Sequence, residues 1–179
     1  MIANPPLGVR SLIVLVGPPG SGKSTWARQN GRGAVHVSQD DVIDAISPDG
    51  FDHIYRPVYA AAEDAVARVA LEHGHTVIVD RTNRTRGHRY RWLAIARDME
   101  SPVIAVTMHA SLSLCRERNH RRQGERRLSE ERIERMIAAF EPVRLDEGLT
   151  AIFDDFVGKS EILESLRKEI IHEYCDQAR

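Results

Sequence analysis

The sequence lacks the features that mark membrane, secreted and disulfide-stapled proteins. Its 179 residues include two cysteines, Cys115 and Cys175, too few for a disulfide framework or a cysteine-based metal site. Apolar runs such as 12–16 are far shorter than the roughly 20 residues that cross a bilayer. The N-terminal residues show no basic cluster followed by a long apolar stretch, so no secretory signal is expected. We therefore expect a cytoplasmic protein that does not enter a membrane.

Length and hydrophobic content limit the domain organisation. A chain of this length makes one compact domain and is too short for two ordinary ones. Hydrophobic residues make up 42% of the sequence, which is enough for a buried core and argues against wholesale disorder. We predict a leader at 1–10 and a single domain at 11–179.

Lysine is scarce, and arginine carries the basic charge. The chain has 3 lysines and 22 arginines, with a formal net charge of −1. The charge is uneven, because 81–135 hold 14 arginines and 7 acidic residues while both flanking regions are net acidic. Arginine favours bidentate contacts with phosphate, although codon usage in a GC-rich genome also raises its share. The clustering is the informative observation, since the overall charge predicts no broad nucleic-acid-binding surface.

Short apolar runs alternate with helical patterns along the chain. We expect strands at 11–16, 34–38, 76–79, 103–108 and 151–157. We expect helices at 23–29, 40–46, 57–73, 86–99, 111–119, 129–140 and 160–174. Because the strands are almost wholly apolar, this order predicts an α/β fold with a parallel sheet of about four or five strands, covered by helices on both faces. Binding sites in such folds lie at the carboxyl ends of the strands.

A phosphate-binding motif follows the first expected strand. Residues 17–25 read GPPGSGKST and match G-x-x-x-x-G-K-[ST] at every fixed position. Backbone N–H groups of such a loop point at phosphate oxygens, helped by the N-terminus of the following helix. Lys23 is expected to reach the β- and γ-phosphates, and Ser24 to ligate Mg²⁺. The sequence thus predicts a P-loop NTPase or kinase fold that binds ATP or another NTP through Gly17, Gly20, Ser21, Gly22, Lys23, Ser24 and Thr25.

The motif alone does not choose between a kinase, an ATPase and a GTPase. No N-K-x-D motif for reading guanine is present. An AAA-type ATPase would need a strand that ends in an acidic pair, whereas the third expected strand ends in Asp80 followed by Arg81. The size of the chain and its late arginine-rich segment favour a small phosphotransferase.

Aspartates follow the second and third expected strands. Asp40 is expected to face the γ-phosphate, where a carboxylate takes the proton of an attacking hydroxyl. The alternative, stronger for Asp41, is that these carboxylates cap the short helix that follows. Asp80 is expected to bind the acceptor or an arginine, or to support the water shell of Mg²⁺. A plain turn residue is the alternative for Asp80.

The segment after Asp80 adds candidate acceptor-binding residues. Thr82 and Asn83 follow the strand directly, and Arg89 lies on the next helix, where Arg86 shares its face. Ordinary turn residues and a solvated basic face are the alternatives. Beside a phosphate-transfer site, these side chains would hold an anionic acceptor.

A second arginine-rich segment joins two expected helices at 116–127. Phosphoryl transfer spreads negative charge over the equatorial oxygens, which guanidinium groups on a mobile lid stabilise. Arg118 and Arg122 are four residues apart, so one helical face would aim both at the nucleotide. We predict an arginine-rich helical lid at about 116–140, with surface charge as the alternative.

Together these residues resemble the kinase domain of polynucleotide 5′-hydroxyl kinases, the end-healing enzymes of phage and bacterial RNA and DNA repair. The resemblance covers roughly 11–140 and rests on the phosphate loop through 20–28, on Asp40, on 80–83 with Arg89, and on 118–122.

The resemblance implies a role for each matching residue. Asp40 would be the general base on the 5′-hydroxyl, Arg118 would lie over the purine and Arg122 would contact the transferring phosphate. One position departs from the family. An arginine usually stands three residues after the base and grips the 3′-phosphodiester of the acceptor, and this chain has Ile43 there.

The first hypothesis is an ATP- and Mg²⁺-dependent kinase that acts on a 5′-hydroxyl end of RNA or DNA, with Asp40, Lys23 and Arg122 as catalytic residues. The second is a small-molecule or nucleotide kinase of the same fold, which Ile43 favours. The third is a nucleotide-dependent regulatory or binding module with little transfer activity. The sequence leaves open the acceptor, the donor base, the oligomeric state and any partner ligase or phosphatase.

Overall fold

The structure is a computed structural model and describes residues 10–122 and 124–156. Strands and helices alternate as the sequence predicts. The strands are β1 (Leu12–Val16), β2 (Val35–Ser38), β3 (Val77–Asp80), β4 (Val103–His109) and β5 (Ala151–Phe156). The helices are α1 (Lys23–Asn30), α2 (Gln39–Ile46), α3 (Arg56–Glu72), α4 (Arg86–Asp98), α5 (Leu112–His120) and α6 (Glu130–Ala138), with short 3₁₀ turns η1 (His53–Tyr55), η2 (Gly124–Arg126) and η3 (Leu145–Glu147).

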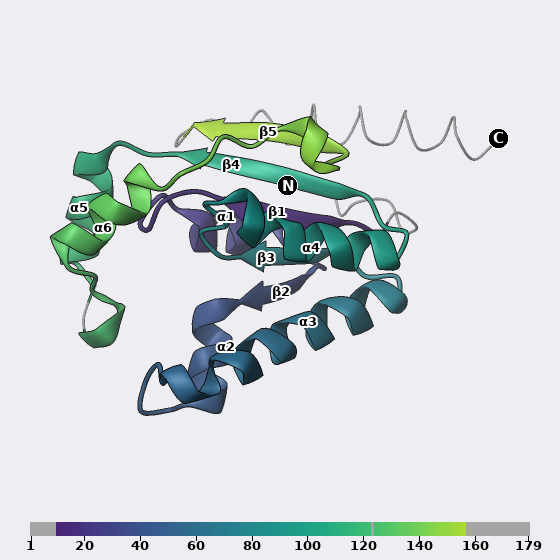
Figure 1. The fold of residues 1–179 in the computed structure, drawn as a ribbon, viewed down its shortest axis with the longest axis horizontal. Coiled ribbons are helices and arrows are strands. Elements are labelled where there is room, and N and C mark those ends of the chain that lie inside the picture. The colour runs from purple at the N-terminus through teal and green to yellow at the C-terminus, as the bar shows by residue number, and fades with distance from the viewer. Residues whose placement is uncertain (1–9, 123, 157–179) are drawn as a thin grey trace.

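The five strands form one sheet in the order β2-β3-β1-β4-β5. Every neighbouring pair is parallel, and the register sets Ser38 beside Asp80 and Leu15 beside Asp80 on the other side. The carboxyl ends of the strands therefore share one edge. Figure 1 shows α5 and α6 beyond this edge, at the end to which the arrows point.

Helices cover both faces of the sheet, which confirms the predicted fold class. Leu12, Val14 and Val16 of β1 face one core with residues of α3 and α4, among them Leu71 and Trp92. The alternate β1 residues face a second core, which contains Leu15, Trp26 and Ala27. Because side chains alternate across a strand, a run that is apolar at every position is buried on both faces.

The predicted lid is a pair of short helices, α5 and α6, with η2 between them. Arg116 joins the two helices through ion pairs with Glu130, at 2.7 Å, and with Glu134. The Asn119 amide donates to the Leu128 carbonyl and accepts from the Leu128 N–H. These contacts hold α5 against α6, and α5 begins at Leu112, one residue after the helix start predicted at 111.

Most other boundaries lie within one or two residues of the expected ones. The helix expected at 160–174 and most of the leader expected at 1–10 lie outside the described residues. Within the part of the chain that is described, no helix is both long enough and apolar enough to cross a membrane.

Candidate active site

The phosphate loop connects β1 to α1 at the carboxyl edge of the sheet. Gly20 and Gly22 have φ angles of 82° and 103°, in the left-handed region that a side chain rarely adopts. Gly17 is tight, because a Cβ there would meet the Ser21 hydroxyl at 2.6 Å and the Met108 carbonyl at 2.9 Å. The Gly17 N–H also donates to the Thr82 carbonyl at 3.1 Å, which ties the loop to the turn after β3. The predicted glycines thus stand where the loop needs them.

Lys23 lies inside this loop. Its ammonium donates to the carbonyls of Gly17 and Pro18 at 2.9 and 2.8 Å, and the residue is buried. Burial lowers the pKa of Lys23 to about 8, with Asp80 opposing that shift and Arg122 adding to it. The ammonium is thus held at the loop by weak carbonyl acceptors, a setting in which phosphate oxygens would be stronger partners.

Asp80 sits at the end of β3 between the loop and β2. Burial raises its pKa, but hydrogen bonds from His36 and Ser24 and the charge of Lys23 outweigh burial, so the net shift is downward. The Nε2 atom of His36 lies 3.4 Å from Oδ2 of Asp80. A carboxylate next to the loop serine is a fitting support for a Mg²⁺ ligand.

Sequence reasoning missed His36. The one available signal was a polar residue at an alternate position of an otherwise apolar strand, Val35 to Val37. The contact with Asp80 depends on the pairing of β2 with β3, which pattern alone does not reveal.

Asp40 lies in the first turn of α2, directly after β2. Ser38 is the residue that caps this helix, because its hydroxyl accepts from the Asp41 N–H at 3.3 Å. Capping therefore accounts for neither aspartate. Asp40 is exposed, and it is close enough to Lys23 to raise the pKa of that ammonium. Asp40 and Asp80 thus both lie close enough to Lys23, at the carboxyl edge of the sheet, to stabilise its positive charge.

Arg118 and Arg122, the two arginines predicted in the lid, both lie close to the phosphate loop. The Nη1 atom of Arg118 donates to the Gly20 carbonyl at 2.8 Å. Arg122 is close enough to Lys23 to lower its pKa. The shared helical face that we predicted is wrong, because α5 ends at His120 and Arg122 lies beyond it. Both side chains reach the loop region because the chain turns there.

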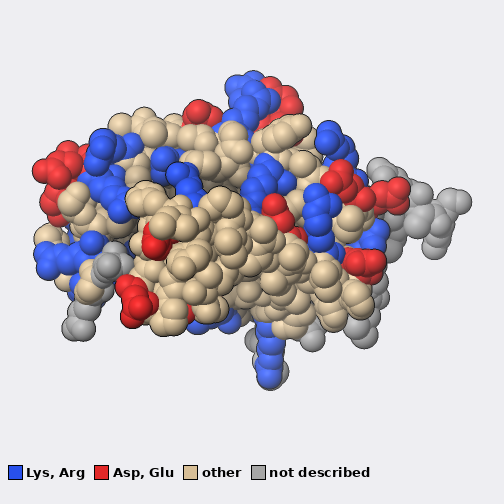
Figure 2. Space-filling view, turned by 60° about the horizontal axis from the view of Figure 1, so that its bottom comes forward, with Lys and Arg blue, Asp and Glu red and all other residues tan. Residues whose placement is uncertain are grey.

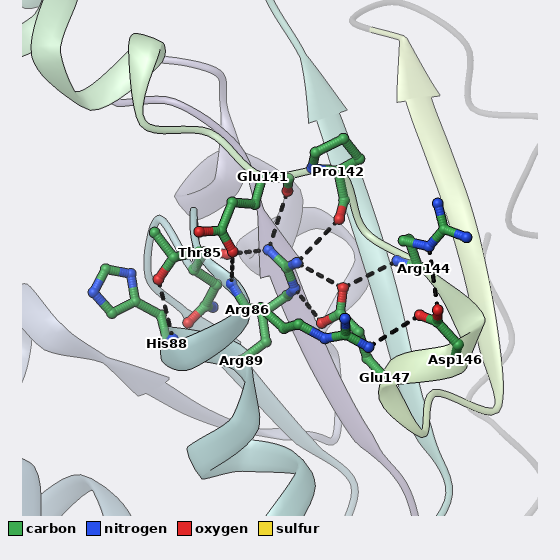
Figure 3. Close-up of polar contacts among 10 residues, drawn as sticks. Thr85, Arg86, His88, Arg89, Glu141, Pro142, Arg144, Asp146 and Glu147 are labelled. Carbon is green, nitrogen blue, oxygen red and sulfur yellow. Dashed lines mark hydrogen bonds and ion pairs between the residues drawn. The ribbon is translucent and has the colours of Figure 1, made fainter.

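Arg89 and Asn83 are placed differently from the expectation of acceptor contact. Both side chains are buried, and Arg89 makes an ion pair of 2.7 Å with Glu147, whose side chain is also buried. The Asn83 amide donates to the Leu15 carbonyl at 2.8 Å and accepts from the Trp92 indole at 3.1 Å. Figure 3 shows Arg89 between Glu147 and the backbone of Glu141. These bonds brace the turn after β3, and acceptor contact through Arg89 would require breaking them.

The structure therefore divides the predicted site residues. It gathers around the loop, at the carboxyl edge, Gly17, Gly20, Ser21, Gly22, Lys23, Ser24, Asp40, Asp80, Arg118 and Arg122. Thr25 is exposed on α1, and Thr82 is half-buried and contacts the loop through its carbonyl. A parallel sheet with a lysine-bearing phosphate loop and a helical lid defines a nucleotide-binding P-loop domain of the kinase type.

The family comparison agrees with this class. A family model described as "AAA domain" matches residues 12–143, most of the described chain. The chain belongs to this family of P-loop domains.

Two curated relatives are named as polynucleotide kinases. The chain is 26% identical over 148 residues to a bifunctional polynucleotide phosphatase/kinase of Schizosaccharomyces pombe, covering 80% of this chain and 33% of that protein. It is 26% identical over 161 residues to a protein of Autographa californica nuclear polyhedrosis virus named as a bifunctional polynucleotide kinase/RNA ligase, covering 82% and 23%. The chain thus spans a third or less of these relatives. The suspected resemblance is borne out at this level.

Solved structures share the fold at low identity. A chain of the Pnkp1/Rnl/Hen1 RNA repair complex has a TM-score of 0.66 at 22% identity, covering 78% of this chain and 46% of that one. A gluconokinase from Sinorhizobium meliloti has 0.65 at 18%, covering 96% and 99%. Chaetomium thermophilum Kti12, solved with ADP-AlF3, has 0.62 at 20%, covering 92% and 97%. These likenesses concern the fold, and the named proteins differ in what they act on.

Proposed function

We propose that this chain is an ATP-dependent phosphotransferase that moves the γ-phosphate to a 5′-hydroxyl end of RNA or DNA. The observation that carries the proposal is the joint placement of Lys23, Asp40 and Asp80 at one edge of the sheet. The two polynucleotide kinase relatives support this class of acceptor. The proposal assigns the reaction to residues of this chain, while any second activity of those longer relatives lies outside it.

The chemistry follows from what each group can do. Asp40 is an exposed carboxylate and would accept the proton of the attacking hydroxyl as the new P–O bond forms. Lys23 and the loop N–H groups would bind the β- and γ-phosphates. Arg122 would stabilise the negative charge that builds up on the transferring phosphate, and Arg118 would lie over the purine of the nucleotide.

The residues present also fit Mg²⁺. The candidate oxygen ligands are the Ser24 hydroxyl and the neighbouring Asp80 carboxylate. Within 10–122 and 124–156, no group of three or more His, Cys, Asp or Glu side chains could hold a metal on its own. This suits Mg²⁺, which is bound through few protein ligands together with phosphates and water, and which would neutralise phosphate charge when bound.

The direct test is transfer of label from γ-labelled ATP to a 5′-hydroxyl oligonucleotide. Asp40→Asn removes the base but keeps the shape, so we expect transfer to fall by about 10²- to 10⁴-fold. Asp41→Asn is the matched control, because it changes the next carboxylate of the same helical turn and should keep most activity. Equal activity of all three proteins would refute the role of Asp40.

A small-molecule acceptor is the second candidate, and one observation favours it. Ile43 stands where the resembling family has the arginine that grips the acceptor backbone. Salt separates the two candidates, because polynucleotide affinity falls steeply as salt rises. A KM for the oligonucleotide that does not change between low and moderate salt, with faster transfer to a small polyol, would select this second candidate.

A further inference from the structure

Two arginines that follow the carboxyl edge of the sheet have no counter-ion among the described residues. Arg56 begins α3 and is exposed, and Arg84 lies in the turn between β3 and α4. Neither makes an ion pair among the described residues, unlike Arg68, Arg86 and Arg91, which each bind a carboxylate. Unpaired guanidinium groups gathered at one place form a site for an anion.

The Arg84 side chain has a buried donor without an acceptor. Its Nε atom is buried and has no partner, although the Arg84 carbonyl accepts from the Glu141 N–H at 2.8 Å. A buried donor without an acceptor is uncommon in folded proteins, because it loses its hydrogen bond to water without replacement. A bound phosphate oxygen would supply the missing acceptor.

Arg81 follows β3 at the carboxyl edge of the sheet. It directly follows Asp80, and its Nη1 atom is 2.6 Å from Glu63, which Arg91 also contacts at 2.9 Å. Arg91 also pairs with Asp64 at 2.6 Å, so two carboxylates serve these two guanidinium groups, and the second Glu63 oxygen is buried without a partner. Burial lowers the pKa of Arg81, Glu63 opposes this, and the charges of Arg91 and Arg56 lower it further. Glu63 and Asp64 balance the charges of Arg81 and Arg91, so the positive charge without a carboxylate among the described residues is that of Arg56 and Arg84.

An aromatic surface adjoins the cluster. Tyr55 immediately precedes Arg56, and both Tyr55 and Phe51 are exposed large hydrophobic residues. Their rings pack around Tyr59, with centroids at 6.4 and 5.6 Å. Figure 2, in which the lower side of Figure 1 comes forward, shows a broad area without charged side chains, to which the exposed Val58, Val66 and Val69 of α3 contribute. Aromatic faces next to arginines are the combination that binds single-stranded nucleic acid.

We propose that Arg56, Arg81 and Arg84 form an anion site that holds the first phosphodiester of a single-stranded acceptor, with a nucleobase stacked on Tyr55. The inference rests on the proposed function. The three arginines would bind the acceptor phosphate in place of the family's arginine, whose position is occupied by Ile43 in this chain. Because Ser38 and Asp80 are paired across β2 and β3, Asp40 and Arg81 leave neighbouring strands at the same edge. A hydroxyl near Asp40 and a phosphate near Arg81 can then belong to one nucleotide.

Binding of a 3′-labelled, 5′-hydroxyl oligonucleotide tests the site without any turnover. The anisotropy of the label is measured with ADP present, over a series of salt concentrations. We expect Arg84→Gln and Arg56→Gln each to weaken binding by about tenfold or more and to reduce the salt slope by about one. Tyr55→Leu should weaken binding by a similar factor without changing the slope. Arg68→Gln, on the same helix as Arg56 but paired with Asp98, is the matched control and should bind like the unchanged protein.

Acceptor kinetics separate this site from the chemistry. Arg84→Gln should raise KM for the oligonucleotide and leave KM for a free nucleoside, which has no phosphate, unchanged. Arginine variants that bind with the original affinity and salt slope would overturn the site even if transfer occurs. Arginine-dependent binding without any label transfer would support the site and refute the proposed function instead. Failure of the unchanged protein to bind the oligonucleotide at any salt would overturn both.

Discussion

Two sets of arginines in this molecule differ in what surrounds them. Arg89 uses all its N–H donors: Glu147 accepts two at 2.7 Å, and the carbonyls of Asn83, Glu141 and Pro142 accept the others. Arg56, Arg84 and Arg122 make no ion pair within the described ranges.

The difference separates residues that build the site from residues that remain available to a substrate. A guanidinium with every donor satisfied in a buried ion pair has nothing left for a ligand. One without a carboxylate keeps its donors and its charge. In this chain the local sequence does not distinguish the two sets, because Arg84, Arg86 and Arg89 occupy a single short stretch.

The largest effect is expected at Arg122. Changing Arg122 to Gln should lower kcat by about 10³-fold, because a guanidinium on the transferring phosphate is worth that much or more, and should leave the melting temperature nearly unchanged. Arg121→Gln is the matched control, since Arg121 pairs with Glu117 at 2.5 Å on the exposed side. Similar kcat values for the two variants would contradict a contact between Arg122 and the transferring phosphate.

Arg89 should affect stability first. Arg89→Met leaves the Glu147 carboxylate buried without its ion-pair partner and with only the Arg144 N–H still donating to it, so we expect the free energy of unfolding to fall by about 3–5 kcal/mol. Urea denaturation measures this change, and Arg86→Met, which breaks an exposed pair with Asp146, should cost about 1 kcal/mol or less. A stable Arg89→Met protein with a raised KM for the acceptor would instead return Arg89 to the substrate contacts.

A smaller, graded effect is expected from pH. The pKa of Lys23 is about 8 in the free protein, and phosphate oxygens beside the ammonium would raise it in the complex. Between these two pKa values nucleotide binding takes up a proton, so Kd for ATP should rise by about tenfold per pH unit above pH 8. Calorimetry in two buffers of different ionisation enthalpy would detect the proton. Affinity that stays constant from pH 7 to 9.5 would contradict this behaviour of Lys23.

The smallest effect concerns the contact between the lid segment and α2. Arg126 pairs with Asp44, and both side chains are exposed. Such pairs contribute about 0.2–1 kcal/mol, so Asp44→Asn should change the melting temperature little and KM for ATP by less than about fivefold. A larger loss would mean that this pair holds the lid segment in place.

Sequence pattern predicted the alternation of elements and the phosphate loop, because both depend on neighbouring residues. The roles of Arg89 and His36 could not be predicted from the sequence pattern. Arg89 is satisfied by Glu147, far away in the sequence, and the contact of His36 with Asp80 exists only because β2 pairs with β3. The face shared by Arg118 and Arg122 failed because α5 ends at His120. Contacts between residues far apart in the sequence decide which polar side chains already have a partner in the fold. The spacing of residues along the chain does not reveal these contacts.

The most direct measurement is the chemical position of the label after incubation of the protein with γ-labelled ATP, Mg²⁺ and a 5′-hydroxyl oligonucleotide. We predict that nuclease digestion of the product releases the label as a nucleoside 5′-monophosphate. The Asp40→Asn protein should give little such product. Label recovered only as inorganic phosphate, with the oligonucleotide unlabelled, would contradict the proposed transfer.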